Sequence, residues 1–250
     1  MMTRPSNSHY DKKLFEARQN IIRKRNVFAL LHQKIAHMLQ KEVALDASPV
    51  ILDAGCGEGS HLQKILAMYN YDTTMAIGLD VAKEGILTAA KNYSNVMWLV
   101  GDIANPPLAD DSCHVILNIL SPANYREFKR ILTSDGLVIK VVPRSNYLKE
   151  IREAFYTDQD KKTYHNDDIV TLFKQHFHLK HRCSLCYQKR LHQTELMNLV
   201  QMTPLTWKAD KEALDAFIKQ KFTEITIDVD ILIGTHKWHK GGKNNGKHKR

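Results

Sequence analysis

The stretch Val50-Ile51-Leu52-Asp53-Ala54-Gly55-Cys56-Gly57-Glu58-Gly59-Ser60 decides the fold of this chain. Its first three residues are apolar and predict a buried strand, and three glycines follow at every second position. Glycine has no Cβ atom, so such a turn can bring backbone N–H groups close to a ligand. The helix expected after the turn would direct its positive end toward the same place. The stretch therefore predicts a nucleotide-binding turn.

The spacing of the glycines and an acidic residue further along the chain indicate which kind of nucleotide cofactor the turn binds. Nicotinamide- and flavin-binding turns follow the pattern G-x-G-x-x-G, whereas here the third glycine comes one residue earlier. Asp80 closes a second apolar strand, Met75–Leu79, where a carboxylate can accept both hydroxyls of a ribose. Gly55, Gly57 and Gly59, followed by Asp80, resemble motif I and the second-strand acid of the class I S-adenosylmethionine-dependent methyltransferases. The resemblance implies an enzyme that binds S-adenosylmethionine.

Strand and helix patterns alternate from Val50 onward, which predicts an α/β fold with helices on both faces of the sheet. We expect a Rossmann-like, mostly parallel seven-stranded sheet, preceded by amphipathic helices from Tyr10 to about Glu42. The predicted strands are 50–53, 75–80, 96–100, 113–119, 137–142, 176–187 and 225–233. The expected segments are an N-terminal helical extension (1–45), the cofactor-binding core (46–190), a helical substrate-side insert (191–222), the last core strand (223–236) and a basic disordered tail (237–250).

Composition and charge favour a globular protein with a polyanionic partner. Hydrophobic residues make up 43% and charged residues 25% of the chain, which is ordinary for a globular domain. The formal net charge is +9, with basic residues concentrated in the N-terminal segment and the tail. We find no apolar run of membrane-spanning length and no signal peptide, so we expect a cytoplasmic protein. The four cysteines predict reduced thiols and no metal site.

A second motif narrows the resemblance. Met202-Thr203-Pro204, followed after two residues by Trp207, resembles the Met-Thr-Pro-x-x-Trp signature of the bacterial large-subunit (23S) ribosomal RNA guanine-N1 methyltransferases. The stretches 15–18, 53–59, 78–83 and 186–187 agree with the same family in order and spacing. Members usually begin with a four-cysteine zinc module, whereas the first cysteine here, Cys56, lies inside the glycine turn. The resemblance implies N1-methylation of a guanine in a hairpin of that RNA.

The cofactor site is expected along the carboxyl ends of the first three strands. Asp102 could accept from the adenine amino group, as an aspartate at this place often does in the superfamily that the chain resembles, or it could equally well cap a turn. Tyr147 stands where the family has a histidine that touches the cofactor. The predicted cofactor contacts are Asp53, Gly55, Gly57, Glu58, Gly59, Asp80, Val81, Asp102, Ile103, Asn118 and Tyr147.

The acceptor pocket is expected at the end of the fourth strand. We predict that Asn118, Pro122 and Trp207 position the guanine, with Trp207 as a stacking surface for an extruded base. Burial in the core is an equally good interpretation of Trp207. No residue stands out as the base that removes the N1 proton, because Asp110 and Asp111 lie on a loop and favour solvent.

Two other functions fit parts of the sequence. A small-molecule methyltransferase would have the same fold, but it would need no basic surface. A non-catalytic RNA-binding relative would have lost the cofactor, yet Asp53, Asp80 and the three glycines of the turn are intact. The sequence leaves the oligomeric state open, with a homodimer as one alternative.

Overall fold

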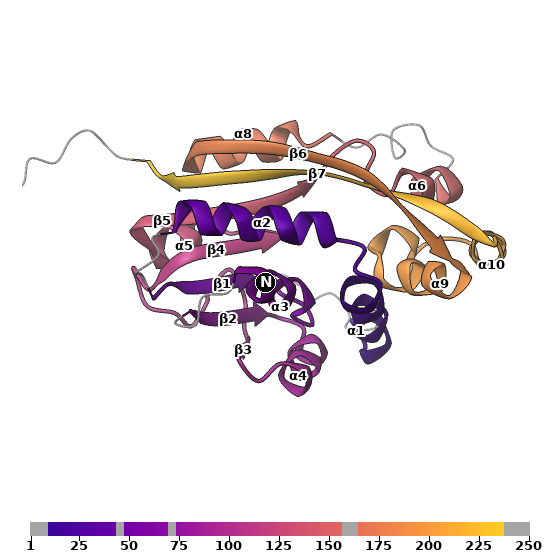
Figure 1. Cartoon of the computed structure of the whole chain (residues 1–250), viewed down its shortest axis with the longest axis horizontal. Helices are drawn as coiled ribbons and strands as arrows, with labels where there is room; N and C mark the ends of the chain where they lie inside the picture. The colour runs from indigo at the N-terminus through magenta and orange to yellow at the C-terminus, as the bar shows by residue number, and fades with distance from the viewer. Residues whose placement is uncertain (1–9, 44–47, 70–73, 157–164, 238–250) are drawn as a thin grey trace, which may run out of the picture.

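A seven-stranded sheet forms the centre of the molecule (Figure 1). The structure is a computed structural model and describes residues 10–43, 48–69, 74–156 and 165–237. The strand order is β3-β2-β1-β4-β5-β7-β6; β1 to β5 are parallel, and β7 is antiparallel to both of its neighbours. This confirms the predicted fold class. The strands are β1 (Val50–Ala54), β2 (Met75–Asp80), β3 (Met97–Val100), β4 (Cys113–Ile119), β5 (Leu132–Pro143), β6 (Phe177–His192) and β7 (Phe222–His236).

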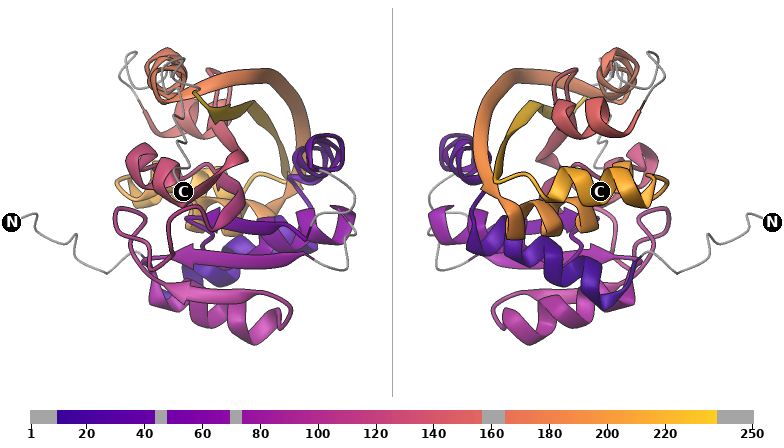
Figure 2. Two further views of the ribbon diagram at one scale, coloured as in Figure 1. Left: turned by 90° about the vertical axis from the view of Figure 1, so that its left-hand side faces the viewer. Right: turned by 90° about the vertical axis from the view of Figure 1, so that its right-hand side faces the viewer.

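Helices cover both faces of the sheet (Figures 1 and 2). Helices α2 (Ala29–Glu42) and α3 (Ser60–Tyr69) pack on one face, and α5 (Tyr125–Ile131) and α8 (Asp167–His176) pack on the other. Each face has its own buried apolar cluster, as expected for parallel strands that are covered on both sides. The other helices are α1 (Lys12–Gln19), α4 (Lys83–Asn92), α6 (Lys149–Phe155), α9 (Gln193–Met202) and α10 (Lys211–Ile218), with a π-helical turn at Asn20–Lys24 and a 3₁₀ turn at Pro204–Thr206.

The predicted N-terminal extension forms two helices that lie apart from each other. Helix α1 begins at Lys12, and the side chain of the preceding Asp11 caps it by accepting from the N–H of Leu14 at 2.9 Å. The π-helical turn and Asn26, which has a positive φ of 54°, change the chain direction before α2. Helix α2 then packs beside α3, whereas α1 lies against α4 and α9 (Figure 1). Helix α1 thus lies beside the carboxyl ends of the strands.

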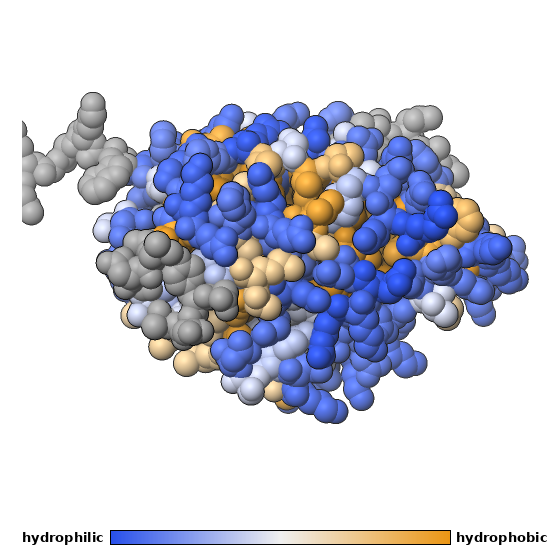
Figure 3. Space-filling model, viewed as in Figure 1, coloured by the Kyte–Doolittle hydropathy of each residue, from blue (hydrophilic) through white to orange (hydrophobic). Residues whose placement is uncertain are grey.

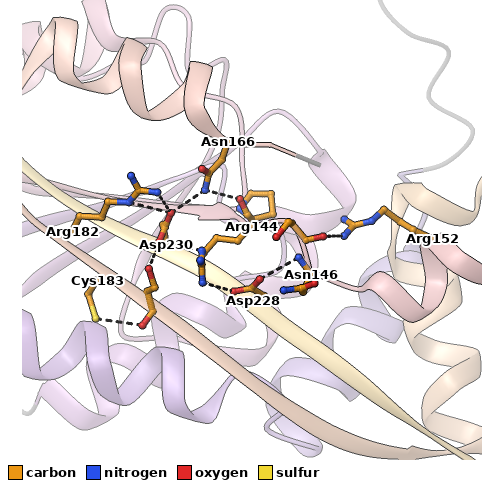
Figure 4. A network of polar contacts seen from close by, with 11 residues as sticks. Arg144, Asn146, Arg152, Asn166, Arg182, Cys183, Asp228 and Asp230 are labelled. Carbon is orange, nitrogen blue, oxygen red and sulfur yellow. Dashed lines mark hydrogen bonds and ion pairs between the residues drawn. The ribbon is translucent and has the colours of Figure 1, made fainter. Parts of the chain in front are cut away.

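Two buried acids on β7 hold the chain that leaves β5 (Figure 4). Asp228 accepts from the Arg144 guanidinium at 2.9 Å and from the backbone N–H of Asn146 at 3.1 Å. Asp230 accepts from Arg182 on β6 at 2.6 Å and from Asn166 at 3.0 Å. Both acids are fully buried, so these charged hydrogen bonds replace their lost hydration. The network fixes the start of the segment that leads into α6.

Several boundaries differ from the prediction. The fifth strand was predicted at 137–142, but β5 begins at Leu132, and its added residues lie next to an irregularity in its pairing with β4. Strands β6 and β7 are also longer than predicted, because they form a long antiparallel pair. The predicted tail lies outside the described residues, apart from Lys237.

The surface of the face shown in Figure 3 is mainly hydrophilic, and polar side chains interrupt its hydrophobic areas. Within the described residues, no helix combines the length and apolar character that a membrane span requires.

Candidate active site

The glycine turn has the backbone conformation that its sequence predicts. Gly55, Gly57 and Gly59 have φ angles of 83°, 59° and 77°, a region that residues with a Cβ rarely adopt. The N–H groups of Gly55 and Cys56 donate to the Leu79 carbonyl at 2.8 and 3.1 Å, which joins the turn to β2. A Cβ on Gly55 would lie 1.9 Å from Ser121 Oγ. Glycine at position 55 therefore allows the turn to approach the loop after β4.

Asp80 braces the same turn from the end of β2. One carboxylate oxygen accepts from the N–H of Gly57 and the other from the N–H of Ala82, each at 2.8 Å. A carboxylate oxygen has more than one lone pair, so each can still accept from a ligand. Asp80 lines the cleft above the turn, where the predicted ribose contact would be made.

A cleft of about 470 Å³ opens above the turn, a volume typical of small-molecule sites. Six predicted cofactor contacts line it, whereas the other five do not. Those that line it are Gly55, Gly57, Asp80, Val81, Asp102 and Ile103, and those that do not are Asp53, Glu58, Gly59, Asn118 and Tyr147. Helix α1 contributes to the wall of the cleft with Leu14, Phe15 and Arg18, which the sequence analysis did not assign to the site.

Arg18 connects α1 to the glycine turn. Its Nε atom lies 2.7 Å from the Glu58 carboxylate, which is fully buried. The two residues are far apart in the sequence, and the salt bridge forms only because α1 packs over the turn. Glu58, which was predicted to contact the cofactor, is therefore held by Arg18, and its other oxygen has no hydrogen-bond partner among the described residues.

Asp53 lies buried beneath the turn at the end of β1. Neither of its carboxylate oxygens has a hydrogen-bond partner among the described residues. Burial, and then the charge of Asp80, raise the pKa of the Asp53 carboxyl to about 7. An ammonium group close to Asp53, such as the amino group of a bound S-adenosylmethionine, would favour the ionised carboxylate and give it a partner. The turn, Asp80 and Asp53 together fit this cofactor.

A second cavity of about 440 Å³, which we call the acceptor chamber, adjoins the cleft at the ends of β4 and β5. Leu120 lines both spaces and has a positive φ of 52°, which is rare for a branched residue and is found at functional sites. Tyr147 lines the chamber, not the cleft, and burial raises the pKa of its hydroxyl. The two spaces share Arg18, Leu120, Ser121, Pro122, Met202 and Pro204.

The three residues predicted to position the acceptor occupy different places. Pro122 lies where the two spaces meet. Trp207 lines the cofactor cleft, with its ring edge-on to Tyr10 at 5.5 Å between centroids. Asn118 lines neither space, because it is fully buried beneath them. Its amide nitrogen donates to the carbonyls of Ala54 and Pro122, both at 2.8 Å.

Lys140 is a chamber residue that the sequence analysis missed. It is only 4% exposed, and its ammonium donates to Asn118 Oδ1 and, at 3.1 Å, to the carbonyl of Ser121. Burial lowers the pKa of Lys140 to about 8. A lysine within the apolar run Leu137–Val142 was the available signal, since a charge in a buried strand is rare without a role.

A pair of histidines lies beneath the chamber. His32 Nε2 and His61 Nδ1 are 2.8 Å apart, and His61 lines the chamber. Burial lowers the pKa of His32 to about 3 and that of His61 well below its ordinary value, so both rings are neutral near pH 7. Asp110, considered in the sequence analysis, instead pairs with Arg130 at 2.7 Å and lines neither space.

The basic N-terminal segment is partly engaged in contacts within the chain. Arg18 pairs with Glu58, Arg25 pairs with Glu195, and Arg23 lies over the Tyr93 ring at 5.4 Å. The charge of this segment was predicted to meet a polyanionic partner, but these three arginines also make contacts within the chain. Within the described residues, no group of three or more His, Cys, Asp or Glu side chains could hold a metal ion.

Comparisons with known proteins agree with this geometry. A family model described as a methyltransferase domain matches residues 51–136, which include the glycine turn, Asp80 and β4. Solved structures show the same fold at low sequence identity. The PH0226 protein of Pyrococcus horikoshii OT3 covers 86% of this chain and 91% of its own, with a TM-score of 0.55 at 15% identity. The MccD protein covers 81% of this chain and 96% of its own, with a TM-score of 0.52 at 14% identity.

Two relatives have a higher sequence identity to this chain than these solved structures. YxjB of Bacillus subtilis (strain 168), provisionally named a 23S rRNA (guanine-N(1)-)-methyltransferase, is 41% identical over 234 residues, which are 93% of this chain and 83% of YxjB. The 23S rRNA (guanine(748)-N(1))-methyltransferase of Streptomyces fradiae is 25% identical over 82% of this chain and 74% of its own length.

Proposed function

The chain belongs to the family of 23S rRNA guanine-N1 methyltransferases, and from this premise we propose that it transfers the methyl group of S-adenosylmethionine to N1 of a guanine in 23S ribosomal RNA. The observation that carries the proposal is the 41% identity over 93% of the chain. The joined cleft and chamber support it, because methyl transfer needs donor and acceptor in adjacent sites.

The residues have separate tasks in this reaction. Asp80 and the glycine turn would hold the ribose and the rest of the cofactor, and Asp53 would lie near its amino group. The cofactor supplies an electrophilic methyl group on its sulfonium. The chain therefore mainly has to align the guanine N1 atom with that methyl group and exclude water. Leu120 and Pro122, which line both spaces, would contribute to this alignment.

The acceptor guanine would have to leave its base pair. The N1 edge takes part in Watson–Crick pairing, and the A-form major groove is too narrow to admit protein side chains. A chamber of about 440 Å³ suits one extruded base, with Pro122, Met202 and Pro204 at its entrance from the cleft. We therefore infer a hairpin loop as the target, methylated in the cytoplasm where ribosomal RNA is made. Trp207 and Tyr10 would offer stacking surfaces beside the cleft.

A methyl-transfer assay tests the proposal. Purified enzyme with tritiated S-adenosylmethionine is expected to label unmodified 23S RNA and to leave 16S RNA of the same source unlabelled. The Asp80→Ala enzyme is the negative control for cofactor binding. Label found only in small-molecule extracts would favour the small-molecule alternative and reject the proposal. A folded protein that binds no S-adenosylmethionine would favour the alternative of a non-catalytic RNA-binding relative.

A further inference from the structure

Removal of the guanine N1 proton needs a base, and the acceptor chamber limits the choice. No carboxylate is among the described residues that line the chamber. The ionisable side chains that line it are Arg18 from α1, His61 from α3, Lys140 from β5, Tyr147, and Arg152 from α6. An arginine does not release its proton in proteins, and the raised pKa of Tyr147 keeps its hydroxyl protonated. His61 and Lys140 remain.

His61 is poorly suited to the task. Its Nδ1 atom is hydrogen-bonded to His32, and both rings are buried. The same burial lowers the pKa of His61 well below its ordinary value, so this ring binds a proton weakly. A base with so little proton affinity gives little driving force for removing the proton from a weak acid such as N1.

The surroundings of Lys140 leave a lone pair for the chamber. A neutral amine has two N–H bonds and one lone pair, and Lys140 has two fixed acceptors, Asn118 Oδ1 and the Ser121 carbonyl. Asn118 cannot turn its amide around, because its nitrogen already donates to Ala54 and Pro122. Both N–H bonds are thus directed into the protein, and the lone pair is left for the space that Lys140 lines.

On the basis of the proposed function, we propose that Lys140 is the general base that accepts the N1 proton of the acceptor guanine, and that Asn118 positions it. The Lys140 lone pair forms a bond to the N1 proton, and the N1–H electron pair stays on nitrogen. That pair forms the bond to the methyl carbon as the carbon–sulfur bond breaks and its electrons go to sulfur. The products are N1-methylguanine, S-adenosylhomocysteine and protonated Lys140, which returns its proton to water.

Charges around Lys140 agree with this role. Arg18 and Arg152 line the same chamber and would favour the negative charge that develops on the guanine. Helices α5 and α8 cover one face of the sheet. In these helices, burial raises the pKa of Tyr125 to about 12 and lowers the pKa of His176, so both side chains are neutral near pH 7. On β7, Asp228 and Asp230 are engaged by Arg144 and Arg182. Because Lys140 itself has a pKa of about 8, an appreciable fraction of it is neutral near pH 7 to 8.

The test is single-turnover methylation of 23S RNA by the Lys140→Met and Lys140→Arg enzymes. Methionine keeps an unbranched side chain that is one atom shorter and has no amine, and arginine keeps the positive charge but cannot act as a base. We expect both variants to lose about 100-fold or more in rate at pH 7, with little change in the KM for RNA. The matched control is Lys174→Met, an exposed lysine on α8, which should keep the wild-type rate. S-adenosylmethionine binding, measured by calorimetry, should be unchanged in all three, because Lys140 does not line the cleft.

The pH profile gives a readout that a structural role would not produce. The wild-type rate should rise with pH and level off near the pKa of Lys140, about 8. In Lys140→Met that inflection should disappear, and the rate should keep rising until the guanine N1–H itself ionises. A wild-type rate that does not depend on pH would overturn the inference, and this measurement does not require any variant to fold. A Lys140→Arg enzyme as active as the wild type would also overturn it. A wild-type enzyme that methylates no guanine N1 would instead reject the proposed function.

Discussion

Replacing Arg18 with methionine tests whether the first helix is part of the cofactor site. Arg18 Nε lies 2.7 Å from the Glu58 carboxylate, which is 0% exposed, while the Arg18 side chain is 25% exposed. Breaking a buried salt bridge by removing one partner costs about 3–5 kcal/mol, because it leaves a buried charge without compensation. Water reaches the arginine side of this pair, so we expect a loss of about 2–3 kcal/mol in the free energy of unfolding.

Urea unfolding followed by circular dichroism measures this loss. The control is Arg126→Met, because Arg126 is an exposed arginine on α5 whose removal should change stability by no more than about 0.5 kcal/mol. Adding Glu58→Gln to Arg18→Met removes the stranded charge, so the double variant should be more stable than Arg18→Met alone. The apo protein is used, so that cofactor binding does not enter the comparison.

Cofactor binding gives a second, independent measurement. Leu14 and Phe15, which line the cleft, lie on the same helix as Arg18. Loosening α1 should therefore weaken S-adenosylmethionine binding as well. An Arg18→Met protein as stable as Arg126→Met, with wild-type cofactor affinity, would refute the reasoning. It would mean that α1 is held by its apolar contacts alone.

The remaining predictions concern the cleft. Asp80→Ala should raise the Kd for S-adenosylmethionine at least about tenfold, or 1.4 kcal/mol, in calorimetry, and an unchanged Kd in the folded variant would contradict the assigned ribose contact. Gly59→Ala should lower the melting temperature more than Gly57→Ala, because its Cβ would lie 2.3 Å from the Trp98 ring, against 3.4 Å from Arg18 at position 57; equal losses would mean that only the positive φ matters. The pKa of Asp53 is raised to about 7, and a cationic ligand favours its ionised form. Affinity for S-adenosylmethionine should therefore fall as the pH drops below 7, by up to about tenfold per pH unit, and Asp53→Asn should bind independently of pH in that range.

The parts of the site that depend on local sequence could be predicted. The positive φ angles of the glycine turn and the place of Asp80 at the end of β2 follow from a strand, a turn and a helix that are contiguous in the chain. The mostly parallel seven-stranded sheet was predicted from the alternating strand and helix pattern together with the resemblance to the class I methyltransferases. The extra length of β6 and β7 could not be predicted, because it arises from their pairing with each other.

The residues that were missed depend on contacts between distant segments. Arg18 meets Glu58 only because α1 packs over the glycine turn, and an amphipathic pattern does not say which surface a helix covers. Lys140 lies opposite Asn118 in the β4–β5 register, which is known only once the strands are paired. Asn118 was predicted to contact the acceptor itself. The structure places it one layer deeper, where it holds the lysine that lines the chamber.

The position of the transferred methyl group tests the central claim most directly. Unmodified 23S RNA is incubated with the enzyme and S-adenosylmethionine, then digested to nucleosides for mass spectrometry and, in parallel, copied by reverse transcriptase. We expect 1-methylguanosine and a stop one nucleotide before a single guanine in a hairpin loop, because an N1-methyl group blocks Watson–Crick pairing. Both signals should be absent with the Asp80→Ala enzyme. A methyl group on cytosine, on a ribose 2′-hydroxyl or on another guanine atom would contradict the account.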